Sequence, residues 1–242
     1  MNLSGNKILI TGGASGIGLG LAQQFMREKN TVIVCGRRET ALSSAAASLP
    51  GLIARQCDLS SERGREELFG WISAEHPDLN VLINNAGIQN RMTLEVADFY
   101  AQAKQEIEIN VNAPVHLTSL FLQLNSLRTI MNVSSGLAFV PLTKTPVYSA
   151  TKAFVHSFTL STRALVKDRN VEVIEIIPPA LNTDLGGKGV HDQAPPVHLF
   201  IEAIFQQLRE GKNELTFGFS AQVSQAGADV LGPVFSRMNG AK

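Results

Sequence analysis

Six short apolar runs, separated by stretches with helical spacing, constrain the fold of this chain more than any other feature. The runs are KILIT (7–11), TVIVC (31–35), LIARQC (52–57), NVLIN (80–84), TIMNV (129–133) and VEVIEII (171–177). Short, continuously apolar runs are typical of strands buried on both faces, and the stretches between them favour helices near 16–29, 61–75, 99–123, 149–168 and 197–210. This alternation predicts an α/β fold with a Rossmann-type, doubly wound parallel sheet and helices on both faces.

Length and composition fit one domain that spans residues 1–242. Hydrophobic residues make up 44% and charged residues 17% of the chain, as in compact proteins. The 21 basic and 21 acidic residues cancel, so no net field attracts nucleic acid or an anionic membrane. The start of the chain lacks the pattern of a signal peptide or membrane span, and Cys35 and Cys57 lie in apolar surroundings that favour buried thiols. We therefore expect a cytoplasmic protein whose function lies in a pocket.

A glycine-rich turn follows the first predicted strand and opens a helix. Residues 11–18 read TGGASGIG, with wider glycine spacing than the common GxGxxG pattern. At such a turn the missing side chains let a phosphate approach backbone N–H groups at a helix N-terminus. A glycine turn alone can also be no more than a tight turn, so further motifs must decide between these interpretations.

Two such motifs occur further along the chain. The fourth predicted strand ends in NNAG (84–87), and Tyr148 and Lys152 lie one turn apart at the start of a predicted helix. By itself, a Tyr–Lys pair at this spacing is weak evidence, since such pairs also occur on helix surfaces. Their order after a nucleotide-type glycine turn favours a functional interpretation.

Together these motifs resemble the classical short-chain dehydrogenase/reductases, whose patterns are TGxxxGxG, NNAG and YxxxK in this order. The resemblance covers residues 7–185, and the start ILITGGASGIGL with the double proline at 178–179 is most similar to the DltE-like bacterial subgroup. It implies four catalytic residues, Asn110, Ser135, Tyr148 and Lys152. Ser134 and Asn112 are adjacent alternatives for the serine and the asparagine.

The implied chemistry explains these residue types. A tyrosine has an ordinary pKa of about 10. The Lys152 ammonium, together with the positive nicotinamide ring of the oxidised cofactor, is expected to lower the pKa of Tyr148 so that it can exchange a proton with substrate oxygen. Ser135 would hydrogen-bond the same oxygen as negative charge develops there. By resemblance, Asn110 would hold a water that links Lys152 to solvent. Hydride transfer belongs to the nicotinamide cofactor.

The resemblance also implies a set of cofactor contacts along the chain. They are Gly12, Ser15, Gly16, Ile17, Gly18, Arg37, Asp58, Leu59, Asn85, Ala86, Gly87, Tyr148, Lys152, Pro178, Leu181 and Thr183. Asp58 precedes two serines, so helping to start a helix is an alternative role for it. Pro179 replaces the glycine of the family's PGxxxT segment, which fixes φ and removes a backbone donor close to Thr183.

The end of the second strand predicts a preference for NADP(H), with NAD(H) as the alternative cofactor. No carboxylate stands at Gly36, Arg37 or Arg38, where one would bind a ribose 2′-hydroxyl. Arg37 is the better candidate for a 2′-phosphate contact, with Arg38 available to stack on adenine or add positive potential. Both could instead be solvated loop charges. Ser15 stands where many NADP-preferring relatives carry a basic residue, and Glu39 offsets some of the charge.

The predicted activity is hydride transfer between the nicotinamide nucleotide and a small carbonyl or alcohol substrate. Rival functions are a nucleotide-sensing protein without turnover and, less favoured, an epimerase or dehydratase. A glycine-rich and proline-rich segment at about 184–198 is expected to form a mobile substrate loop. The five histidines show no metal-ligand spacing, so no metal is expected. Apolar residues on several faces of the 99–123 and 149–168 helices favour a homodimer or homotetramer.

Overall fold

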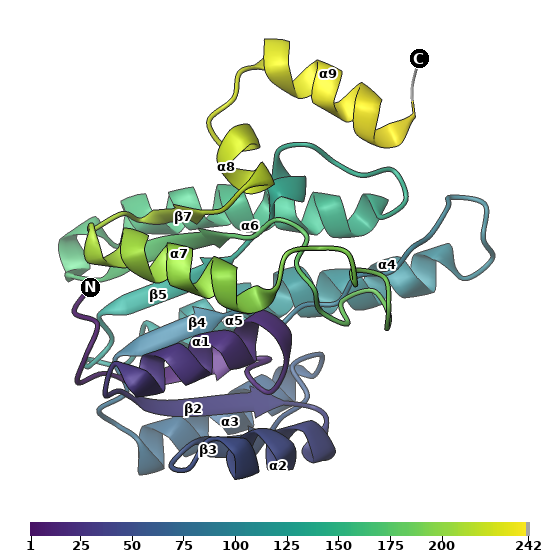
Figure 1. Cartoon of the computed structure of the whole chain (residues 1–242). Coiled ribbons are helices and arrows are strands. Elements are labelled where there is room, and N and C mark those ends of the chain that lie inside the picture. The colour runs from purple at the N-terminus through teal and green to yellow at the C-terminus, as the bar shows by residue number, and fades with distance from the viewer. Residues whose placement is uncertain (241–242) are drawn as a thin grey trace.

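A seven-stranded parallel sheet forms the centre of the protein, with the strand order β3-β2-β1-β4-β5-β6-β7 (Figure 1). The structure is a computed structural model and describes residues 1–240. Its strands are β1 (Lys7–Thr11), β2 (Thr31–Gly36), β3 (Ile53–Gln56), β4 (Val81–Asn84), β5 (Thr129–Val133), β6 (Glu172–Ile177) and β7 (Glu214–Thr216). The first six agree with the predicted runs to within one residue at each end. The sequence did not predict β7, because three residues are too few to show a pattern.

Helices cover both faces of the sheet, which confirms the predicted doubly wound α/β fold. One face packs against α1 (Gly16–Arg27), α2 (Glu39–Ser48) and α7 (Val197–Arg209). The other face carries α3 (Glu62–Glu75), α4 (Phe99–Ile107), α5 (Ala113–Phe121) and α6 (Pro146–Leu165) (Figure 1). Successive strand residues contribute to opposite cores, as in Ile8 and Leu9, so the central strands are mostly apolar.

The topology fixes where a ligand can bind. The chain winds from β1 outward to β3 and then returns to β4 on the other side of β1, so the loops at the carboxyl ends of β1 and β4 diverge. In open parallel sheets such a divergence opens a cleft at the carboxyl ends of the strands. The glycine turn after β1 and the NNAG motif at the end of β4 both lie at this edge.

Three segments depart from the predicted helices, and the first is α2, which the sequence did not predict. The 99–123 stretch is not one regular α-helix, because a π-helical turn at Glu108–Asn112 separates α4 from α5. After β7, the chain adds α8 (Phe219–Val223) and α9 (Ala228–Asn239), and α9 projects from the body (Figure 1). Asn239 ties α9 to the loop before α6, where its amide donates to the Pro141 carbonyl and its Oδ1 accepts from the Thr143 N–H at 2.7 Å. Within residues 1–240, no helix combines the length and apolar character needed to cross a membrane.

Candidate active site

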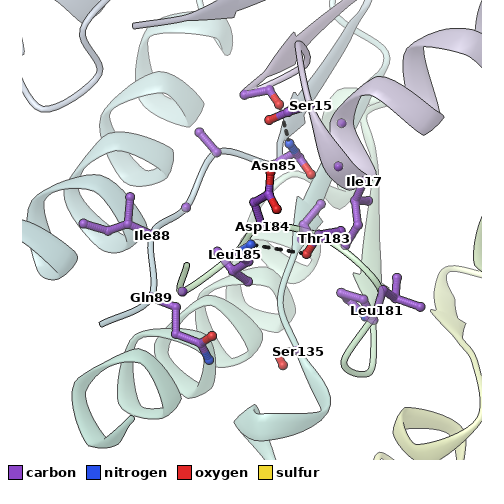
Figure 2. A pocket seen from close by; sticks show the side chains of 18 of the residues that line it. Ser15, Ile17, Asn85, Ile88, Gln89, Ser135, Leu181, Thr183, Asp184 and Leu185 are labelled. Carbon is purple, nitrogen blue, oxygen red and sulfur yellow. Dashed lines mark hydrogen bonds between the residues drawn. The ribbon is translucent and has the colours of Figure 1, made fainter. Parts of the chain in front are cut away.

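One cavity of about 1260 Å³ runs along the carboxyl edge of the sheet. It extends from the arginines after β2 to Tyr148 at the start of α6 and includes most of the predicted site. Figure 2 shows side chains from the glycine turn, the loop after β4 and the segment after β6 converging on it. Of the predicted residues, the cavity is lined by Gly12, Ser15, Gly16, Ile17, Gly18, Arg37, Asp58, Leu59, Asn85, Ala86, Gly87, Ser135, Tyr148, Lys152, Pro178, Leu181 and Thr183. Asn110 alone lies behind its wall.

The glycine turn needs its glycines for two reasons. Gly12 and Gly16 have positive φ values of 63° and 53°, a conformation that L side chains rarely adopt. A Cβ on Gly18 would lie 2.4 Å from the Gly12 carbonyl oxygen and 2.5 Å from the Asn85 amide nitrogen. The turn is thus packed on its inner side and bare on the cavity side, which fits a pyrophosphate held by backbone N–H groups at the start of α1.

Asn85 braces this turn from the end of β4. Its amide donates to the Thr11 carbonyl at 2.8 Å and to the Gly12 carbonyl at 3.2 Å. The Thr11 hydroxyl accepts from the backbone N–H groups of Asn85 and Ala86 at 2.9 and 3.0 Å. These bonds join the glycine turn and the NNAG motif into one hydrogen-bonded unit beneath the cavity. Contact between Asn85 and the glycine turn therefore shapes the predicted nucleotide site from below.

The far end of the cavity carries both exposed arginines that follow β2. Arg38 donates to the Ser15 hydroxyl at 3.3 Å, so its guanidinium reaches the glycine turn. Arg37 instead acts on Asp58 through its charge. Hydrogen bonds from Ser60 are the main reason why the pKa of Asp58 is below its ordinary value, and the charge of Arg37 adds to this effect. Asp58 thus lines the cavity and also organises the turn before α3.

The segment after β6 completes the wall despite its second proline. The Pro178 carbonyl accepts from the Gly136 N–H at 3.0 Å, which anchors the segment to the turn after β5. Thr183 packs against the glycine turn, since a Cβ on Gly16 would lie 3.3 Å from its methyl group. Pro179 therefore leaves Pro178 and Thr183 at the cavity, where the sequence places them.

Tyr148 and Ser135 meet at the closed end of the cavity. Tyr148 is 5% exposed and begins the face of α6 that Lys152 continues one turn later. Burial is the main reason why the pKa of Tyr148 lies above its ordinary value, while a hydrogen bond with Ser135 acts in the opposite direction. Ser134 is the weaker candidate for the serine, because its hydroxyl is already bonded to the buried carboxylate of Glu175.

Lys152 differs from the expectation in what its ammonium contacts. Its Nζ donates to the Val133 carbonyl at 2.7 Å and lies 5.6 Å from the centre of the Tyr148 ring. Burial lowers the pKa of Lys152 to about 8. The lowering of the Tyr148 pKa by Lys152 and the oxidised cofactor stays a prediction. Among the protein's own groups, burial holds the pKa of Tyr148 above its ordinary value, so the phenol is protonated at neutral pH.

Asn110 sits in the π-helical turn and is 1% exposed. Its Oδ1 accepts from the Ile88 N–H at 2.9 Å, and its Nδ2 donates to the Ile88 carbonyl and the Thr151 hydroxyl. Gly87 allows this arrangement, since a Cβ there would lie 3.3 Å from Asn110 Oδ1 and 3.7 Å from Lys152 Nζ. Asn112, the alternative, instead bonds Glu108 at the surface. The geometry therefore favours Asn110.

Glu106, a buried acid one turn before Asn110, was not predicted from the sequence. Its side chain is inaccessible, one carboxylate oxygen accepts from the Asn90 N–H, and the other has no hydrogen-bond partner. Burial raises the pKa of Glu106 to about 7, and its charge contributes to the raised pKa of Tyr148. Helical spacing alone could have placed Glu106 on the face of Asn110, but not its burial.

A second group that the sequence spacing did not show lies on the surface, away from the cavity. Possible ligand atoms of Glu62, Glu66 and His116 lie within 4.8 Å of one another on α3 and α5. Nδ1 of His116 accepts from Arg65 Nε at 3.1 Å. A metal ion bound at Nδ1 would therefore have to displace Arg65.

Comparison with known proteins identifies the family. A model of the short chain dehydrogenase family matches residues 6–194. The chain belongs to this family. It is 42% identical over 226 residues to the uncharacterized oxidoreductase DltE of Bacillus subtilis, and the match covers 89% of each chain. This short-chain dehydrogenase is therefore an NAD(P)-dependent oxidoreductase.

Solved structures agree with this assignment at the level of the fold. A short chain dehydrogenase from Burkholderia cenocepacia, in complex with NADP, has a TM-score of 0.85 at 24% identity, covering 98% of this chain and 99% of that one. A short chain dehydrogenase/reductase from Burkholderia phymatum, in complex with NAD, has a TM-score of 0.77 at 18% identity, covering 89% and 90%. Both likenesses confirm the Rossmann-type sheet with its flanking helices.

Proposed function

We propose that the protein is a carbonyl reductase or alcohol dehydrogenase in which Tyr148 transfers the proton. The meeting of Tyr148, Ser135 and Lys152 at the closed end of a cavity that begins at the glycine turn carries this proposal. Tyr148 gives its hydroxyl proton to the substrate oxygen during reduction and takes one during oxidation. Ser135 donates to the same oxygen and stabilises the charge that develops on it.

Lys152 and Asn110 support this proton transfer. The ammonium lies on the same face of α6 as Tyr148, and its bond to Val133 fixes its place beside β5. It orients the nucleotide ribose and supplies positive charge near the phenol. Asn110 holds the loop after β4 against α6. By its resemblance to the family's asparagine, it is assigned the water that restores the proton to Lys152.

The nicotinamide nucleotide supplies the hydride when it is bound. The glycine turn holds its pyrophosphate, and the residues after β2 and β3 hold its adenosine. Near the reacting end, Thr183 contacts the carboxamide while Pro178 and Leu181 form the adjacent wall. Asn85, Ala86 and Gly87 cover the middle of the cofactor.

NADP(H) is the preferred cofactor in this proposal. The contact between Arg38 and Ser15 adds a structural reason for this preference. Arg37 and Arg38 both line the adenosine end of the cavity, and neither forms an ion pair with a carboxylate within the described residues. The guanidinium of Arg38 covers the serine where a basic residue of the glycine motif would otherwise stand. Arg37 contacts the 2′-phosphate and Arg38 closes the site from the glycine side.

Substrate access is assigned to the 184–198 segment, within a single functional domain spanning residues 1–242. Asn182 closes the base of this segment, because its N–H bonds the Pro195 carbonyl at 2.9 Å and its amide bonds the Asp192 carbonyl at 3.1 Å. Three glycines within it, at positions 186, 187 and 189, have positive φ. A hinged lid over the reacting end is therefore part of the proposal.

The proposed protein is a cytoplasmic homodimer or homotetramer that acts on a small molecule. Free buried thiols at Cys35 and Cys57 suit a reducing compartment. Large apolar side chains are exposed on the adjacent helices α4 and α6, namely Tyr100, Ile107, Phe154, Leu160 and Leu165. A second copy that covers these faces would remove them from water.

The decisive experiment measures kcat/KM for NADPH and NADH with a panel of ketones and aldehydes. We expect turnover with a preference for NADPH, and an Arg37→Asp variant that loses or reverses this preference. Nucleotide binding without turnover of any carbonyl or alcohol would instead favour the nucleotide-sensing alternative. Preference for NADH in the wild type would refute the cofactor assignment and leave the reaction class standing.

A further inference from the structure

A completely buried carboxylate lies behind the reacting end of the cavity. Glu175, on β6, has no exposed surface. One of its oxygens accepts from the hydroxyl of Ser134, the residue after β5, and both oxygens lie close to His156 on α6. Nδ1 of His156 lies 2.9 Å from one oxygen and 3.1 Å from the other. One acid on β6 therefore links the residue that follows β5 to α6.

His156 belongs to the helix face that carries the reacting groups. Tyr148, Lys152 and His156 are spaced at i, i+4 and i+8 on α6, so they follow one another along one side. The ring of His156 also packs on Phe139, with ring centres 4.6 Å apart. The helix that presents Tyr148 is thus clamped both to β6 and to the turn that follows Ser135.

Ser134 connects the same carboxylate to the adjacent Ser135. The Ser134 N–H bonds the Ile176 carbonyl at 2.9 Å, and its hydroxyl bonds Glu175 on the face of the sheet that α6 covers. Because neighbouring residues of an extended chain point in opposite directions, fixing Ser134 on this face directs Ser135 away from it. The Ser135 hydroxyl then lines the cavity and accepts from the Leu137 N–H.

We propose that Glu175, Ser134 and His156 form a positioning cluster that sets the separation between Ser135 and Tyr148. This inference rests on the proposed function, because it matters only if both hydroxyls bind one substrate oxygen. None of the three need touch substrate. They act by holding the end of β5 and the start of α6 in one relative position.

Stability alone is a weak reason for this cluster. A buried polar cluster around a carboxylate often contributes no more than an apolar replacement, because removing polar groups from water offsets the gain from their hydrogen bonds. The same strand and helix are already joined by an ordinary hydrogen bond, from the Asn132 amide to the Thr159 hydroxyl at 3.0 Å. The cluster differs from that bond in acting on the residue next to Ser135.

This difference gives a matched control. Ser134→Ala removes the bond from the residue after β5 to Glu175 on β6. Thr159→Val removes a buried bond between β5 and α6, about two turns beyond Lys152. Glu175→Gln keeps an acceptor for Ser134 and a donor for His156, whereas Glu175→Ala removes both. The readouts are kcat, KM for substrate, NADPH affinity by fluorescence, melting temperature and a crystal structure of each variant.

We expect Ser134→Ala and Glu175→Ala to lower kcat by roughly tenfold to a hundredfold, the effect of misplacing a reacting group by about 1 Å. Their NADPH affinity should stay within about threefold, because the glycine turn is remote from the cluster. Thr159→Val should lower the melting temperature but not kcat, and Glu175→Gln should restore kcat. In crystals of Ser134→Ala, the Ser135 hydroxyl should be displaced relative to Tyr148.

A kcat for folded Ser134→Ala equal to that of the wild type, with Ser135 in place, would overturn the positioning role. So would an equal fall in kcat for Thr159→Val. If Glu175→Ala does not fold, Ser134→Ala and Glu175→Gln still decide the matter. Absence of wild-type turnover is a failure of the proposed function, and the position of Ser135 in the Ser134→Ala crystal then tests the cluster by itself.

Discussion

Replacing Glu106 by glutamine should stabilise the protein above neutral pH. The wild-type carboxyl has no exposed surface, and burial raises its pKa from 4.5 to about 7. In the unfolded chain the same carboxyl ionises near its ordinary value. Glutamine is almost the same shape, can still accept a hydrogen bond from the Asn90 N–H, and carries no charge at any pH.

The magnitude and sign follow from linkage. A difference between 4.5 and about 7 corresponds to about 3 kcal/mol, at about 1.4 kcal/mol per pKa unit. Between these values the folded state retains a proton that the unfolded state has lost. The stabilising contribution is therefore complete below pH 4.5, declines as the pH rises and is lost above about 7. Glu106→Gln removes this decline.

Urea unfolding of both proteins at several values between pH 5 and 8 measures the effect. The difference in unfolding free energy should grow in favour of Glu106→Gln as the pH rises and level off above about 7. Glu108→Gln is the control, because it makes the same chemical change two residues further along, at the start of the π-helical turn. Desolvation acts to raise the pKa of Glu108, but bonds from Arg65 and Asn112 outweigh it, so the net pKa is lowered and no such growth should occur over this range. A pH-independent difference for Glu106→Gln would refute the reasoning.

Three further predictions concern the proposed mechanism. Tyr148→Phe should lower kcat by about a hundredfold to ten-thousandfold, the usual range for a lost proton donor, with NADPH affinity within a few-fold; normal steady-state turnover would remove Tyr148 from the mechanism. Lys152→Ala should weaken both NADPH binding, measured by fluorescence titration, and turnover, and unchanged binding would exclude its contact with the ribose. The 184–198 segment should gain hydrogen-exchange protection when cofactor and substrate bind, whereas equal protection with and without them would contradict a lid.

The sequence predicted the features that depend on local pattern. Strands buried on both faces are visible as continuous apolar runs. The glycine turn, the NNAG motif and the Tyr148–Lys152 pair are each contained in a short stretch of the sequence. That these motifs lie close together in space follows from the rule that parallel strands bring their carboxyl ends to one edge of the sheet. Contacts between residues that are distant in the sequence could not be predicted in this way. No spacing indicates that Arg38 contacts Ser15, or that Glu175 meets both Ser134 and His156.

Conflicts between burial and charge were also hidden in the sequence. The expected effect of Lys152 on Tyr148 considered charge alone, because the depth of the closed end of the cavity was unknown. The helical spacing of apolar residues across 99–123 likewise did not indicate the π-helical turn at Glu108–Asn112. This turn places Asn110 where its amide can bond both Ile88 and Thr151, so the irregularity coincides with a proposed site residue.

The opposite pKa shifts of Tyr148 and Lys152 have one cause, and this cause bears on the direction of proton transfer. Burial disfavours the phenolate of Tyr148 and the ammonium of Lys152, so it raises the first pKa and lowers the second to about 8. At pH 7 both groups still carry their protons. The protein's own residues therefore hold Tyr148 as a donor, which is the state that reduction of a carbonyl requires. Oxidation instead needs a base at this position, so it should gain more than reduction as the pH rises toward the raised pKa of Tyr148.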